Sequence, residues 1–131
     1  MYLYIDTTER EYFEVAAFDA HALVIKKRVA SKRKSSELLL RSIEAIIKAA
    51  KATKDELRGI AVVRGPGSFT ALRIGVVTAN ALAYGLGIPV VGVDKNADFT
   101  TLGSWVNKQK GKNRIVLPEY GGDPLIGKRK R

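Results

Sequence analysis

The residues best suited to bind an anion lie in a short glycine turn. Gly65-Pro66-Gly67-Ser68 follows the apolar stretch Leu57 to Arg64 and precedes a second one that begins at Phe69 or Thr70. A strand, a glycine turn and a helix start would place free N–H groups and the positive end of a helix dipole where phosphate can bind. The candidate residues of this turn are Gly65, Gly67, Ser68 and Thr70.

Other features of this turn argue against phosphate binding. Pro66 removes one backbone donor, no Lys-Ser/Thr pair completes a Walker A loop, and the G-x-G-x-x-G spacing is absent. The alternative is a turn whose glycines let strand and helix pack closely.

Asp6-Thr7-Thr8 is a second polar site, at the end of the apolar run from Met1 to Asp6. A carboxylate followed by two hydroxyls could hold a metal-bound phosphate. It could equally close a turn through an Asx-type hydrogen bond. We therefore count Asp6 and Thr7 with the candidate anion site and leave both interpretations open.

Catalytic groupings are scarce in this sequence. His21 is the one histidine, there is no cysteine, and Ser68 has no evident base and no G-x-S-x-G context. We predict no catalytic residue, no metal site and no cofactor. The absence of cysteine excludes zinc–thiolate chemistry and is compatible with the cytoplasm.

The hydrophobic pattern predicts an α/β domain with a mixed sheet and the order β-β-β-α-β-α-β-α. Residues 1–117 would form one domain and residues 118–131 a basic C-terminal tail. The expected strands are 1–6, 11–18, 22–29, 57–64 and 89–93, with a last one at 113–117. The first expected helix runs from Ser35 or Ser36 to about Ala52, the second from Phe69 or Thr70 to about Gly85, and the third from Asp94 to about Trp105.

The charge favours anionic partners. The chain has 131 residues, 23 of them Lys or Arg against 13 Asp or Glu, for a net charge of +10. The basic residues cluster at 26–28, 32–34, 108–114 and 128–131. They could bind RNA or simply form a solvated surface. We expect no membrane span, because Arg73, several glycines and Pro89 interrupt the longest apolar stretch.

The second helix suggests a protein partner. Gly75, Ala79 and Ala83 are four residues apart and form one stripe of small side chains, and apolar residues cover much of the remaining surface. A helix that is apolar on nearly all sides must be buried on nearly all sides. Either a partner covers it, or the third helix and the tail do so within the chain.

Gly65-Pro66-Gly67-Ser68-Phe69-Thr70-x-Leu72-Arg73-Ile74-Gly75 closely resembles the TsaB (YeaZ) family, accessory subunits in making threonylcarbamoyladenosine on tRNA. The Ile5-Asp6-Thr7-Thr8 run and Gly87-Ile88-Pro89-Val90-Val91-Gly92-Val93 also look like family segments. Family members usually have Gly where Ala71 stands and His where Ser35 stands, and they commonly carry a second domain of similar fold.

The resemblance implies a single lobe of the actin-like, Hsp70-like (RNase H-like) ATPase fold. It also implies a non-catalytic subunit that docks on a TsaD-like catalytic subunit through its first two helices, could form a homodimer through the same surface, and could contact tRNA indirectly. The alternatives are an actin-like ATP-binding protein and an RNase H-like tRNA-binding module. The implied partner interface consists of Leu39, Ile43, Arg73, Gly75, Val76, Ala79, Asn80 and Ala83.

Overall fold

The computed structural model describes residues 1–33, 35–67, 69–110 and 115–117. The elements follow the predicted order. The five strands are β1 (Tyr2–Asp6), β2 (Tyr12–Phe18), β3 (Leu23–Ala30), β4 (Gly59–Val63) and β5 (Val90–Val93). The helices are α1 (Ser36–Ala49), the short 3₁₀ helix η1 (Lys54–Glu56), α2 (Phe69–Leu86) and α3 (Phe99–Asn107).

The strands form one mixed sheet in the order β3-β2-β1-β4-β5. β1, β2 and β3 pair antiparallel as a meander, whereas β1, β4 and β5 are parallel. The β2–β3 connection is tight, because the Asp19 carboxylate accepts the N–H groups of His21 and Ala22. Each parallel connection needs a crossover, which α1 supplies before β4 and α2 before β5. The meander and the two crossovers confirm the predicted mixed sheet.

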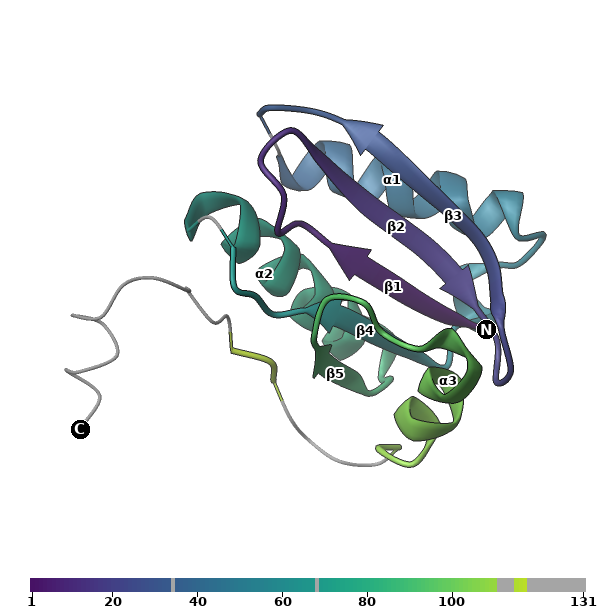
Figure 1. Ribbon diagram of the computed structural model, residues 1–131. Helices are drawn as coiled ribbons and strands as arrows, with labels where there is room; N and C mark the ends of the chain where they lie inside the picture. The colour runs from purple at the N-terminus through teal and green to yellow at the C-terminus, as the bar shows by residue number, and fades with distance from the viewer. Residues whose placement is uncertain (34, 68, 111–114, 118–131) are drawn as a thin grey trace, which may run out of the picture.

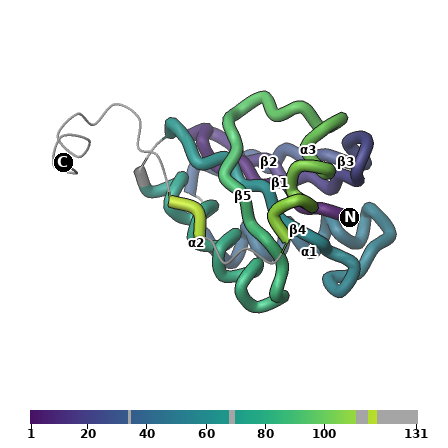
Figure 2. The backbone as a smooth tube through the Cα atoms, turned by 90° about the horizontal axis from the view of Figure 1, so that it is seen from below, coloured from purple at the N-terminus to yellow at the C-terminus, as the bar shows by residue number. Residues whose placement is uncertain are grey.

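The sheet is the middle layer of three. Helices α1 and α2 cover one face and α3 covers the other, as the two views agree (Figures 1 and 2). Alternate residues of the central strands enter the two cores: Leu3 and Ile5 of β1 pack toward α1 and α2, whereas Tyr2 and Tyr4 pack toward α3. β4, whose five residues are all buried, is therefore apolar throughout, as parallel strands usually are.

Local signals fix the helix starts. The Ser35 side chain accepts the Leu38 N–H at 3.1 Å and caps α1, with Glu37 in the first turn. The Asp98 carboxylate caps α3 in the same way, by accepting the Thr100 N–H at 2.9 Å. That bond and a second from the Thr100 hydroxyl hold the pKa of Asp98 below its ordinary value, with the hydroxyl bond the larger cause.

The predicted last strand at 113–117 is wrong for the residues that the structure describes, since 115–117 pair with no strand. Instead, the Asn80 side chain of α2 binds this segment twice. Its amide nitrogen donates to the Val116 carbonyl and its amide oxygen accepts the Val116 N–H, both at 2.9 Å. Here the Asn80 amide, rather than a neighbouring strand, satisfies the backbone N–H and carbonyl groups of Val116. The predicted tail, 118–131, lies outside the described residues.

Candidate functional site

A polar cluster lies where β1 and β5 end, at the same edge of the sheet. Asp6, only 2% exposed, accepts the Thr8 N–H at 2.9 Å and the Thr8 hydroxyl at 2.6 Å through Oδ1. Lys95 follows β5 and donates to Asp6 Oδ2 at 3.1 Å, to Thr8 Oγ1 at 2.9 Å and to Glu9 Oε2 at 2.8 Å. The Asx-type turn, one of the two interpretations of Asp6-Thr7-Thr8, is therefore present, and the Lys95 ammonium group binds both Asp6 and Thr8.

The electrostatics of this cluster favour the charged lysine. Burial alone lowers the pKa of Lys95, but its bonds to Glu9 and Asp6 outweigh that effect and raise the pKa above its ordinary value. Burial, and then the charges of Asp6 and Glu14, raise the pKa of the nearby Tyr4 hydroxyl. Both oxygens of the Asp6 carboxylate are already engaged by this chain's own groups.

The glycine turn lies against this cluster. A β-carbon at Gly67 would come within 3.0 Å of the Thr8 backbone, so the turn and the end of β1 are in close contact. Gly65 adopts a φ of 127°, which favours glycine. Thr70 is exposed, and Ser68 lies outside the described residues. The turn thus meets the predicted close-packing role, and phosphate binding there stays a prediction.

Thr7 points the other way, into the sheet–helix interface. Its hydroxyl is buried and has no hydrogen-bond partner among the described residues. It lies against the backbone of Gly75 in α2, where a β-carbon would overlap it. This contact explains why a glycine is required in the second turn of α2.

No group of three or more His, Asp or Glu side chains within the described residues is placed to hold a metal ion. His21 lies in the exposed β2–β3 turn. The same part of the chain contains no helix long and apolar enough to cross a bilayer.

The small-residue stripe of α2 faces inward, which corrects its expected orientation. Ala79 and Ala83 are buried in this chain's own core, together with Val76 and the α1 residues Leu39 and Ile43. Gly75 is buried against Thr7. The physical reason is that small side chains let α2 approach its own sheet closely. Among the predicted interface residues, Arg73 is exposed, and the Asn80 amide is bonded to Val116.

The exposed face of α2 carries other residues. Arg73, Val77, Ala81 and Tyr84 follow each other at helical spacing and are all exposed. Val77 is 56% exposed and Tyr84 is 89% exposed. We call these four residues the outer face of α2. A large apolar side chain and an aromatic side chain exposed to water on one helix face, here Val77 and Tyr84, are typical of a docking surface.

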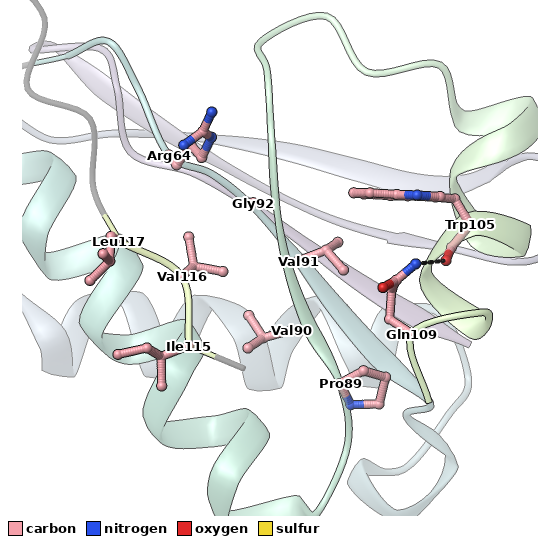
Figure 3. A pocket seen from close by; sticks show the side chains of 10 residues that line it. All are labelled: Arg64, Pro89, Val90, Val91, Gly92, Trp105, Gln109, Ile115, Val116 and Leu117. Carbon is pink, nitrogen blue, oxygen red and sulfur yellow. Dashed lines mark hydrogen bonds between the residues drawn. The ribbon is translucent and has the colours of Figure 1, made fainter. Parts of the chain in front are cut away.

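A groove of about 340 Å³ runs along the outer edge of β5 (Figure 3). Its floor is the edge strand, Val90 to Gly92, and its walls are Trp105 of α3 on one side and residues 115–117 on the other. Trp105 is 45% exposed, and Ile115 and Leu117 are exposed too. β5 pairs with a neighbouring strand on one side alone in the described structure.

Reasoning from the sequence missed Lys95 and the outer face of α2. The position just after β5 was the signal for Lys95, because the carboxyl ends of parallel strands meet at one sheet edge. The signal for Val77 and Tyr84 was that they fall opposite Ala79 and Ala83 on a helical projection.

The sheet order, the two crossover helices on one face and α3 on the other define one lobe of the actin-like ATPase (RNase H-like) fold. YeaZ from Pseudomonas aeruginosa has a similar structure, with a TM-score of 0.62 and 27% identity over 71% of this chain and 42% of that one.

Residues 25–107 match the family model described as TsaD, tRNA N6-adenosine threonylcarbamoyltransferase, and the chain belongs to this family. A transferase of that name from Geotalea daltonii is 50% identical over 62 residues, 47% of this chain and 18% of that protein. The tRNA threonylcarbamoyladenosine biosynthesis protein TsaB of Escherichia coli is 30% identical over 84 residues, 64% of this chain and 35% of that protein. The chain therefore spans about a fifth to a third of the length of these relatives, and its resemblance to TsaB and YeaZ is confirmed.

Proposed function

We propose that this chain is a non-catalytic, TsaB-like subunit that acts in the cytoplasm. It binds a TsaD-type catalytic subunit and supports threonylcarbamoyl transfer to N6 of adenosine in tRNA. The proposal rests on the similarity to YeaZ and TsaB together with one structural observation, the exposed outer face of α2.

The outer face of α2 supports docking by its chemistry. Burying Val77 and the Tyr84 ring under a partner would remove apolar surface from water, at about 25 cal/mol for each Å². Arg73 adds a charged group at one end of the same face, where a carboxylate of the partner can meet it. The same face could pair two copies of the chain. The proposed partner interface therefore lies on the outer face of α2, on the side opposite the small-residue stripe.

An accessory role fits the strand-end cluster better than ATP binding does. A nucleotide with Mg²⁺ needs free carboxylate oxygen, whereas Lys95 and Thr8 already occupy the Asp6 carboxylate. His21, the one histidine of the chain, lies in an exposed turn, so the chain has no pair of histidines to hold a metal ion.

The test is complex formation with the TsaD-type subunit of the same organism, measured by calorimetry and by the mass of the eluted complex. Val77→Arg and Tyr84→Arg should each weaken binding about tenfold or more, a cost of about 1.4 kcal/mol. Val24→Arg is the matched control, because Val24 is an exposed apolar residue of β3, away from α2. It should leave the affinity unchanged.

Full binding by both α2 variants would overturn the docking surface. Failure of the unsubstituted chain to bind the catalytic subunit would overturn the accessory function itself. A homodimer that Val77→Arg dissociates would show that the two associations share one face.

A further inference from the structure

We propose that the β3 edge of the sheet is a docking surface for structured RNA. It would bind the phosphodiester backbone through Lys27 in β3 and through Lys32 and Arg33 in the segment after it. The choice of RNA rests on the proposed function, in which tRNA is the substrate of the complex. The location rests on the charge distribution of this chain.

One stretch of the chain is rich in positive charge and has no negative charge. Residues 20–35 contain six basic residues and no acidic one. Residues 36–56, which form α1 and η1, contain four basic and four acidic residues and are neutral. Among the described residues, 20–33 form the densest run of positive charge, with five basic residues and no acidic one, whereas residues 57–110 carry six basic and two acidic residues spread over several elements. Such a run is the pattern of an anion-binding surface.

Local ion pairs divide these cations into two groups. Glu14 of β2 pairs with Lys26 at 3.4 Å and with Arg28 at 3.0 Å, and Arg28 also covers the Tyr12 ring. Lys27, Lys32 and Arg33 form no ion pair with any carboxylate that the structure describes. These three exposed side chains can therefore neutralise phosphate without giving up an internal partner.

The position of β3 makes the edge accessible. It is the outermost strand and pairs with β2 alone, and six of its eight residues are exposed. α2 lies over the β1–β4 side of the sheet, away from β3 (Figure 1). An RNA on the β3 edge and a partner on the outer face of α2 would therefore occupy different surfaces, so both can bind at once.

The experiment measures the affinity of the full chain for an unmodified tRNA transcript between 50 and 200 mM salt. In a plot of log affinity against log salt concentration, each phosphate contact contributes about one unit to the slope. The test variant is Lys27→Gln/Lys32→Gln/Arg33→Gln. The matched control is Arg41→Gln/Lys48→Gln/Lys54→Gln, which removes the same charge from the neutral α1–η1 region.

We expect the test variant to bind at least tenfold more weakly at 50 mM salt and to reduce the salt slope by about 3, one unit for each cation removed, while the control keeps the slope of the unsubstituted chain. Equal losses in both variants would overturn the proposal, because any loss of charge would then suffice. No RNA binding by the unsubstituted chain would overturn it too, as would binding to phosphatidylserine vesicles but not to RNA.

These outcomes are separable from the accessory function. Complex formation with the catalytic subunit depends on the outer face of α2 and should be the same for both triple variants. If edge charges serve only to prevent strand-to-strand association, the test variant will self-associate without any change in RNA affinity, and the proposal fails.

Discussion

Gly75 of α2 and Thr7 at the end of β1 are in direct contact, with the Thr7 hydroxyl occupying the space that a β-carbon at position 75 would need. The hydroxyl is buried, so neither side can give way easily. This contact sets how closely the helix approaches the sheet, and with it the position of the outer face of α2.

Gly75→Ala should destabilise the fold by about 1–3 kcal/mol, because an added methyl overpacks this contact. The control is Gly85→Ala in the same helix, where a β-carbon would meet nothing within 4 Å. That change should stabilise α2 by about 0.5–1 kcal/mol. Urea unfolding followed by circular dichroism measures both.

A double variant isolates the cause. Thr7→Ala removes the hydroxyl and methyl that an alanine at 75 would meet, so Thr7→Ala/Gly75→Ala should recover part of the stability lost by Gly75→Ala. Strict additivity of the two changes would show that the steric explanation is wrong.

Lys95→Met should destabilise the fold on the order of 1–3 kcal/mol, because it leaves an oxygen of the buried Asp6 carboxylate without its donor. The estimate stays below that of a fully buried ion pair, since Lys95 is 40% exposed. Lys48→Met on the surface of α1 is the control and should change the free energy of unfolding little.

The same ion pair predicts a pH dependence. The pKa of Lys95 is raised in the folded state above its ordinary 10.5, so its contribution is complete below that pH and is lost as the pH rises through the folded value. The difference in unfolding free energy between the unsubstituted chain and Lys95→Met should therefore be constant near neutrality and shrink above about pH 10.5. A constant difference at alkaline pH would contradict the assignment.

Asn80→Ala should release the segment at residues 115–117 from α2. The Val116 N–H donates to the Asn80 amide oxygen, so its hydrogen exchange should accelerate about tenfold or more once that acceptor is gone. Gln109→Ala is the control, because Gln109 makes only a long 3.4 Å bond to the Trp105 carbonyl. Unchanged exchange at Val116 would show that other contacts hold the segment.

Ser35→Ala should cost about 1 kcal/mol, since it removes the cap that accepts the Leu38 N–H. Ser36→Ala, one residue further and inside the helix, should be close to neutral because alanine is the better helix former. Equal stability of the two variants, measured by thermal unfolding, would contradict the capping role.

The sequence allowed the elements to be predicted because their signals are local. A short apolar run identified β1, alternation identified β2 and β3, a serine cap at Ser35 or Ser36 marked the start of α1, and the glycine turn separated β4 from α2. The last strand failed because the competing interaction is not local: Asn80 takes both polar groups of Val116, which lies 36 residues away.

The candidate site was harder to predict for the same reason. Asp6 and Lys95 are 89 positions apart, and only the strand order brings them together. The small stripe of α2 was recognised correctly as a close-packing surface, but composition alone does not say whether a helix turns such a stripe toward its own sheet or outward. The outer residues Val77 and Tyr84 settle that orientation.

Trp105 is the single tryptophan of the chain, and it lies on α3, the one helix in the described part of the chain that covers this face of the sheet. Its emission spectrum consequently reports on the α3 side of the sheet, while far-ultraviolet ellipticity is dominated by α1 and α2 on the opposite face. A spectral shift that precedes the loss of ellipticity on heating would reveal that the two sides of the sheet melt in succession rather than together.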